Sequence, residues 1–185
     1  MNRKYWVSLV VLMMVFVAAT GASAESGSSS YWSEEALVKL QVDVETQRNG
    51  VSLYEYVSIS DGNNVVFYVA EKAGEPVFCH EYHGDKGQWN APVKEDEVAM
   101  AGTFWTPSEL DWALIPKVVE DAQMQVFSLG ATENHQGEKV EVVSFSKKGI
   151  IVTMSNSKLE GKWLQYQTDE KGTFVDAQIL DQEEH

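Results

Sequence analysis

The chain has 185 residues, of which 44% are hydrophobic and 11% aromatic, and this content excludes disorder over most of its length. Its 14 Lys and Arg residues against 28 Asp and Glu residues give a formal net charge of −14, which disfavours nucleic acid and anionic membranes as partners. A single cysteine, Cys79, excludes an intramolecular disulfide framework and any metal cluster held by several cysteines.

Residues 1–24 have the pattern of a bacterial signal peptide. Arg3 and Lys4 precede the apolar run Val7–Ala19, and Ala22-Ser23-Ala24 fits the small-residue cleavage pattern. The apolar run has 13 residues, whereas a helix that crosses a bilayer needs roughly 20. We therefore expect cleavage and a soluble mature protein that is periplasmic or secreted and does not insert into the membrane. An uncleaved N-terminal anchor is the alternative.

A polar leader and a first helix are expected next. Residues 25–30 read Glu-Ser-Gly-Ser-Ser-Ser, a composition typical of a flexible segment. Ser33 is a suitable N-cap for a helix, and Asn49-Gly50 is suited to end it because both residues tolerate positive φ. The apolar residues of this segment recur at helical spacing: Leu37, Leu40 and Val44.

Strands are expected after this helix. Runs of β-forming residues separated by turn residues predict strands at 51–60, 65–71 and 77–83. Residues 88–102 are ambiguous. Within them, the charged run Lys94–Glu97 is interpreted as a solvated acidic loop.

A second helix is predicted from Thr106, because Thr106, Pro107 and Glu109 form a capping box with proline in the first turn. Pro116 is expected to break or kink this helix, with a further short helix over Lys117–Ala122. The remaining pattern predicts five strands, at 123–130, 138–146, 149–155, 162–168 and 173–180.

Together these elements predict an α+β fold of antiparallel β-sheet meanders with two short helices. We expect a first α+β unit at 31–103 and a second at 104–185, which could also form one continuous domain. Tyr31-Trp32-Ser33 before the first helix is matched by Phe104-Trp105-Thr106, 73 residues later. This similarity is consistent with a tandem helix-plus-meander duplication, and chance recurrence is the alternative.

The segment from Cys79 to His83 is the densest cluster of reactive side chains. On a strand, Cys79, Glu81 and His83 lie on one face and His80 on the other. These residues suggest a zinc or copper site in a periplasmic protein, although side chains two apart on a strand are separated by roughly 6–7 Å. The alternative is an ordinary strand with a buried cysteine. No nucleophile or phosphate-binding motif is present, so the sequence favours a non-enzymatic protein without a cofactor.

The leading interpretation is an exported protein that binds, inhibits or assists another exported protein. Without residues 1–24 the chain keeps 12 basic and 28 acidic residues, a net charge of −16. Such a surface attracts a basic partner, and the alternative is a soluble protein adapted to an acidic or saline setting, which the charge alone does not distinguish. Trp89 and Trp163 are the candidate exposed aromatic contacts. The acidic residues Glu95, Asp96 and Glu97 are the candidate charged contacts.

Overall fold

The computed structural model describes residues 32–47, 53–60, 64–84, 86–98, 111–129 and 133–182. The predictions for residues 1–24, for the leader at 25–30 and for the capping box at Thr106–Glu109 lie outside these ranges.

The first half of the chain is one helix followed by a meander of strands. The elements are α2 (Glu34–Gln47), β1 (Leu53–Ser60), β2 (Asn64–Ala70), β3 (Pro76–His83), β4 (Gln88–Trp89) and β5 (Val93–Val98). Ser33 begins α2 as expected, since its hydroxyl oxygen accepts a hydrogen bond from the Ala36 backbone N–H at 3.3 Å.

The second half repeats this order of helix and meander. The elements are the 3₁₀ turn η3 (Trp112–Leu114), α3 (Ile115–Met124), β6 (Phe127–Leu129), β7 (Glu133–His135), β8 (Lys139–Ser146), β9 (Gly149–Ser155), β10 (Lys162–Thr168) and β11 (Phe174–Asp181). The α+β class with antiparallel meanders and two short helices is therefore confirmed.

One local prediction was wrong, because Lys94–Glu97 belongs to strand β5, which pairs with β3, and is not a loop. The change expected near Pro116 is seen: the 3₁₀ turn η3 ends at Leu114, and the short helix α3, with Pro116 in its first turn, contains the predicted Lys117–Ala122 segment. A proline is accommodated there because the first backbone N–H groups of a helix have no intrahelical acceptor to lose.

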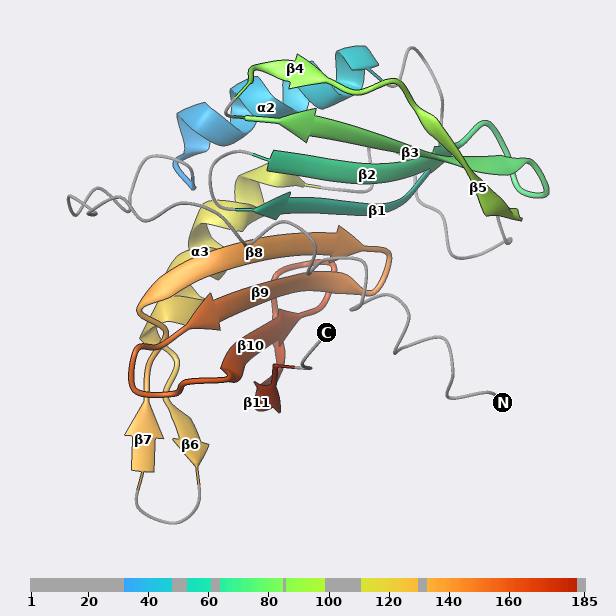
Figure 1. The fold of residues 1–185 in the computed structure, drawn as a ribbon. Helices are drawn as coiled ribbons and strands as arrows, with labels where there is room; N and C mark the ends of the chain where they lie inside the picture. The colour runs from blue at the N-terminus through green and yellow to red at the C-terminus, as the bar shows by residue number, and fades with distance from the viewer. Residues whose placement is uncertain are drawn as a thin grey trace.

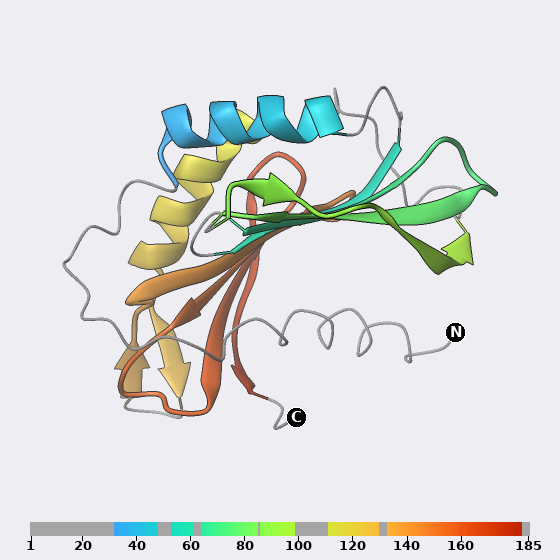
Figure 2. The ribbon, with the colours of Figure 1, turned by 45° about the horizontal axis from the view of Figure 1, so that its top comes forward.

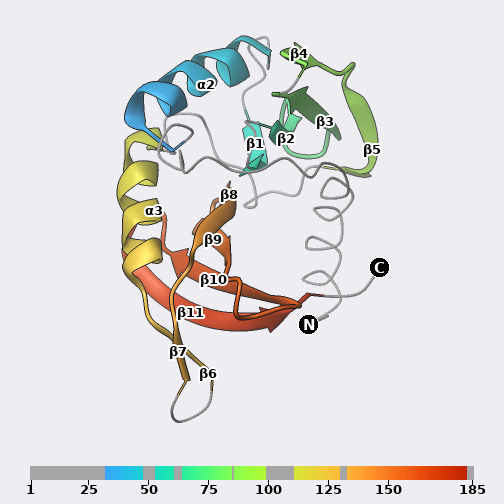
Figure 3. The same cartoon turned by 60° about the vertical axis from the view of Figure 1, so that its left-hand side comes forward.

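The described strands of the main sheet are arranged in the order β11-β10-β9-β8-β1-β2-β3-β4, with β5 also paired to β3, and every pairing is antiparallel. The two meanders join where β1 pairs with β8, with Ser58 opposite Ser144 (Figure 1). In Figure 2 the sheet bends strongly between the two meanders. Figure 3 shows α2 and α3 on the same side of it. We call this side the helix face and the other the helix-free face.

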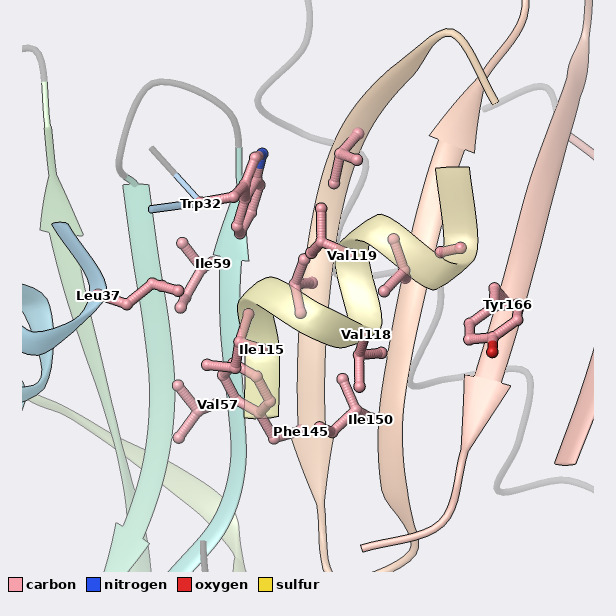
Figure 4. Close-up of a cluster of buried hydrophobic side chains, with 14 of the residues drawn as sticks. Trp32, Leu37, Val57, Ile59, Ile115, Val118, Val119, Phe145, Ile150 and Tyr166 are labelled. Carbon is pink, nitrogen blue, oxygen red and sulfur yellow. The ribbon is translucent and has the colours of Figure 1, made fainter. Parts of the chain in front are cut away.

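The hydrophobic core lies between the helices and the sheet. Val57 opposes Phe145 across the β1–β8 junction, so the central strands contribute to one continuous cluster. Leu37 of α2 and Ile115 of α3 are both buried in this cluster (Figure 4). Each fully buried aliphatic or aromatic side chain contributes about 1.5–3 kcal/mol, so this shared core connects the two halves energetically.

Candidate functional site

Side-chain alternation and strand register divide the candidate residues between the two faces of the sheet. Cys79 is opposite Tyr68, and Glu81 is opposite Val66, on the helix-free face. The same face carries Trp163, which is opposite Leu180 at the other end of the sheet. His80 and Trp89 lie on the helix face with the core residue Phe67.

Cys79 is a buried free cysteine next to Tyr68. Burial raises the pKa of the Cys79 thiol to about 11, and the nearby carboxylates of Glu81 and Glu95 add to this rise. Burial also raises the pKa of Tyr68, with a further contribution from Cys79. Cys79 is therefore a neutral thiol near pH 7, a form that is a poor nucleophile and a poor metal ligand.

Glu81 and His83 are joined by the side chain of Asn90. Its amide nitrogen donates to Glu81 Oε2 at 3.0 Å and lies 3.0 Å from His83 Nε2. The expected alignment of Cys79, Glu81 and His83 on one face is thus seen in the strand register, with two of these side chains held by an amide.

His80 is separated from that group by the sheet itself. Its ring stacks on Phe67 with centroids 4.7 Å apart and planes 8° apart, and burial lowers its pKa. The structure therefore does not bring the four candidate ligands of the Cys79–His83 segment together. Among the residues that the structure describes, no group of three or more His, Cys, Asp or Glu side chains could hold a metal ion.

Trp89 packs at the edge of the core. Its ring centroid lies 5.1 Å from that of Tyr82 and 5.4 Å from that of Phe67. Trp89 is partly buried against the main core cluster on the helix face. It therefore cannot form one continuous contact surface with Trp163, which is on the opposite face.

Trp163 lies in a group of half-buried and exposed side chains on the helix-free face. Within this group, Gln178 Nε2 donates a hydrogen bond to Gln165 Oε1 at 3.2 Å. We call this group the Trp163 surface. It consists of Ile151, Thr153, Trp163, Gln165, Gln167, Gln178 and Leu180.

The acidic run lies far from the Trp163 surface. Glu95 is half-buried on β5, where its charge raises the pKa values of Cys79 and Tyr68. The side chains of Asp96 and Glu97 lie outside the described part of the structure. In the order of the sheet, five strands separate β5 from β10, which carries Trp163. The tryptophan and the acidic run therefore belong to different regions.

The sequence did not indicate a hollow of about 490 Å³ beside β7. His135 lines it, and its buried Nε2 atom has no hydrogen-bond partner. Glu138 lines it as well, and the backbone N–H of Ser157 lowers the pKa of this carboxyl. The remaining lining residues are Glu133, Asn134, Gln136, Gly137, Asn156 and Lys158. No spacing in the sequence connects residues 133–138 with 156–158, because the fold alone places them together.

No family model matches the sequence, and no curated protein is significantly similar to it. Among solved structures, a putative lipoprotein from Clostridium difficile 630 aligns with a TM-score of 0.43 and 11% identity, covering 75% of this chain and 90% of that chain. At this level the similarity carries no information about function. Within the described residues, no helix combines the length and the apolar character needed to cross a bilayer.

Proposed function

We propose that this chain is exported to the periplasm or the medium and binds another exported protein of basic character, without catalysing a reaction. The observation that carries the proposal is the Trp163 surface, where a half-buried indole lies among amide and apolar side chains. Tryptophan is enriched at the centres of protein interfaces because its large, rigid ring gives much contact area at a small loss of conformational freedom. The glutamine amides add hydrogen-bonding capacity around it.

Export and the basic partner are supported by the sequence. Residues 1–24 carry the charged, apolar and small-residue regions of a signal peptide in order. Without residues 1–24, the net charge of −16 attracts basic proteins and speeds their encounter. A binding role is also supported by Cys79, the strongest potential nucleophile, because burial holds it in the unreactive thiol form.

The proposal can be tested by affinity capture from the exported protein fraction of the native host. The immobilised protein is expected to retain a protein of high isoelectric point, and raising the salt concentration should release it because charge attraction is screened. Trp163→Ala should reduce capture at least tenfold, as expected for an interface tryptophan. Val38→Ala is the matched control, since Val38 is 53% exposed on α2, on the helix side of the molecule.

Two results would contradict the proposal. One is that no exported protein is retained at low salt. The other is that Trp163→Ala and Val38→Ala retain the same protein as well as the unmodified chain does. Far-ultraviolet circular dichroism of both variants shows whether a loss of capture reflects unfolding.

A further inference from the structure

The two edges of the main sheet differ in how well they are protected against pairing with another strand. At one edge, β4 has only two residues, and β5 is a six-residue strand with the charged run Lys94–Glu97 that pairs with β3 in a shifted register. Short strands, charges and register shifts all discourage edge-to-edge pairing. At the other edge, β11 has eight residues, and its pairing with β10 shifts register once, near its start, and is continuous from Asp176 to Asp181.

Hydrogen bonding identifies the backbone groups of β11 that point away from β10. The N–H of Gln182 donates to the Gly161 carbonyl at 2.8 Å, so Gln182 faces the β10 side. In an antiparallel pair the direction of the backbone groups alternates along the strand. The N–H and C=O groups of Ala177 and Ile179 therefore point outward. Among the described residues no strand pairs with this edge, although β6 lies beside β11.

One outward N–H is protected by a carboxylate. The Ala177 N–H donates to Oδ1 of Asp176 at 2.8 Å. Asp176 is exposed and forms no ion pair within the described residues, whereas Asp181 pairs with Lys162. An incoming strand must release the Ala177 N–H from this carboxylate. A lysine or arginine of that strand next to Asp176 would take up the released charge.

The side chains of β11 fit a strand in which basic and apolar residues alternate. Asp176 and Gln178 lie on the helix-free face, and Ala177 and Ile179 on the helix face, where both are packed against the core. Phe174 and Val175 are 51% and 55% exposed at the start of the strand. A second copy of the chain fits less well, because it brings another Asp176 carboxylate and a further net charge of −14.

We propose that the outward edge of β11 binds an extended segment of a basic partner by strand addition, with lysine or arginine on the helix-free face and apolar side chains on the helix face. The proposal rests on the proposed function only for the statement that this segment belongs to an exported protein. Strand addition next to the Trp163 surface would extend that surface, because Gln178 and Leu180 belong to both.

The test uses the ¹⁵N-labelled protein and an acetylated eight-residue peptide of alternating lysine and valine. The backbone amide signals of Ala177 and Ile179 are expected to shift on addition of the peptide, and the signal of Lys94 on β5 is not. A glutamate–valine peptide of the same length is the control for charge.

Ala177→Pro should weaken binding at least tenfold, because proline removes an outward donor and keeps the pairing to β10. Ala177→Ser keeps the donor and should bind as the unmodified chain does.

The proposal is overturned if the lysine–valine peptide shifts no amide of β11 at 1 mM, or if Ala177→Pro binds it as well as Ala177→Ser. It is also overturned if sedimentation equilibrium shows a dimer that Ala177→Pro dissociates, since a second copy would then occupy the edge.

Should Ala177→Pro fail to fold, Asp176→Asn replaces it, with a several-fold loss of affinity for the peptide expected. If partner capture depends on Trp163 but not on Ala177, strand addition is refuted and the proposed function is retained. If the peptide binds at β11 but no exported protein is captured, the proposed function is refuted and strand addition is retained.

Discussion

In the described residues, each half of the molecule is a helix followed by an antiparallel meander, and the second half adds the separate β6–β7 sheet. The two halves also have different side chains on their corresponding strands. In the first half, Phe67 of β2 stacks on His80 of β3, and Trp89 packs against the same ring. In the second half, Val152 of β9 lies opposite Tyr166 of β10. The comparison shows that the helix-plus-meander arrangement depends on alternation of buried and exposed positions, and not on particular core residues.

The helix-free faces of the two halves differ even more. The first half presents the buried Cys79 beside the half-buried Tyr68, whereas the second half presents Trp163 and its neighbouring glutamines. Under the proposed function, the second half carries the contact surface and the first half acts mainly through its share of the common core. Matched substitutions, one in each half, can separate the contributions of the two halves to stability.

The largest expected effect comes from removing one core aromatic from each half. Phe67→Ala and Phe145→Ala should each lower the free energy of unfolding by about 3–5 kcal/mol, because both side chains are fully buried and their removal leaves a cavity. Both variants should unfold in a single urea transition, since one core cluster crosses the β1–β8 junction. Tryptophan fluorescence and far-ultraviolet circular dichroism should report the same midpoint.

Val175→Ala is the control for this experiment, because Val175 is 55% exposed and its truncation should leave the midpoint nearly unchanged. Two separate transitions in either phenylalanine variant would mean that the halves unfold independently, contrary to the shared core.

The second meander is the part of the fold that the sequence predicted best. Residues 139–146, 149–155, 162–168 and 174–181 are strands, close to the predicted ranges, because runs containing β-branched and aromatic residues there are separated by clear turn residues. The run Lys94–Glu97 was misjudged for a physical reason. Its charges are typical of a loop, but an edge strand needs only one neighbour and tolerates exposed charge.

The candidate site could be predicted only in part. Alternation placed Cys79 and Glu81 on one face and His80 on the other, as the strand register shows. The position of Trp89 on the helix face depends on how β4 pairs with β3, and no local pattern contains that information. The edge role of β11 likewise depends on the order of strands in the sheet, which is a long-range property.

A smaller contrast is expected between two turn glycines. Gly149, in the β8–β9 hairpin of the second half, has φ of +123°, and a Cβ there would lie 2.0 Å from the Thr168 carbonyl oxygen. Gly149→Ala should therefore lower the free energy of unfolding by about 2–4 kcal/mol. Gly74, in the β2–β3 turn of the first half, has φ of +88° and no atom within 4 Å of that position. Gly74→Ala should lower it by only about 1 kcal/mol.

Urea denaturation of the two glycine variants under identical conditions measures this difference. If the two variants lose equal stability, crowding at the Thr168 carbonyl does not matter and the β8–β9 hairpin has more freedom than its geometry indicates.

The smallest expected effect is a pH dependence that belongs to the first half. Burial lowers the pKa of His80 below its ordinary value of 6.5, so the unfolded chain binds a proton at this residue before the folded chain does. The stabilisation is therefore complete above about pH 6.5 and is lost as the pH falls below it. The free energy of unfolding from urea titrations should decrease between pH 7.5 and pH 5.

Substitution separates this contribution from the others. His80→Phe should make the pH dependence between 7.5 and 5 shallower, since phenylalanine has no proton to bind. Tyr166→Phe is the matched control in the second half, because burial raises the pKa of Tyr166 and keeps it neutral throughout this range. Glu138 and Asp169, whose pKa values are lowered by backbone N–H groups, lose their stabilisation only at lower pH. An unchanged slope in His80→Phe would show that the folded and unfolded chains protonate His80 alike, and that its burial against Phe67 imposes no penalty on the charged ring.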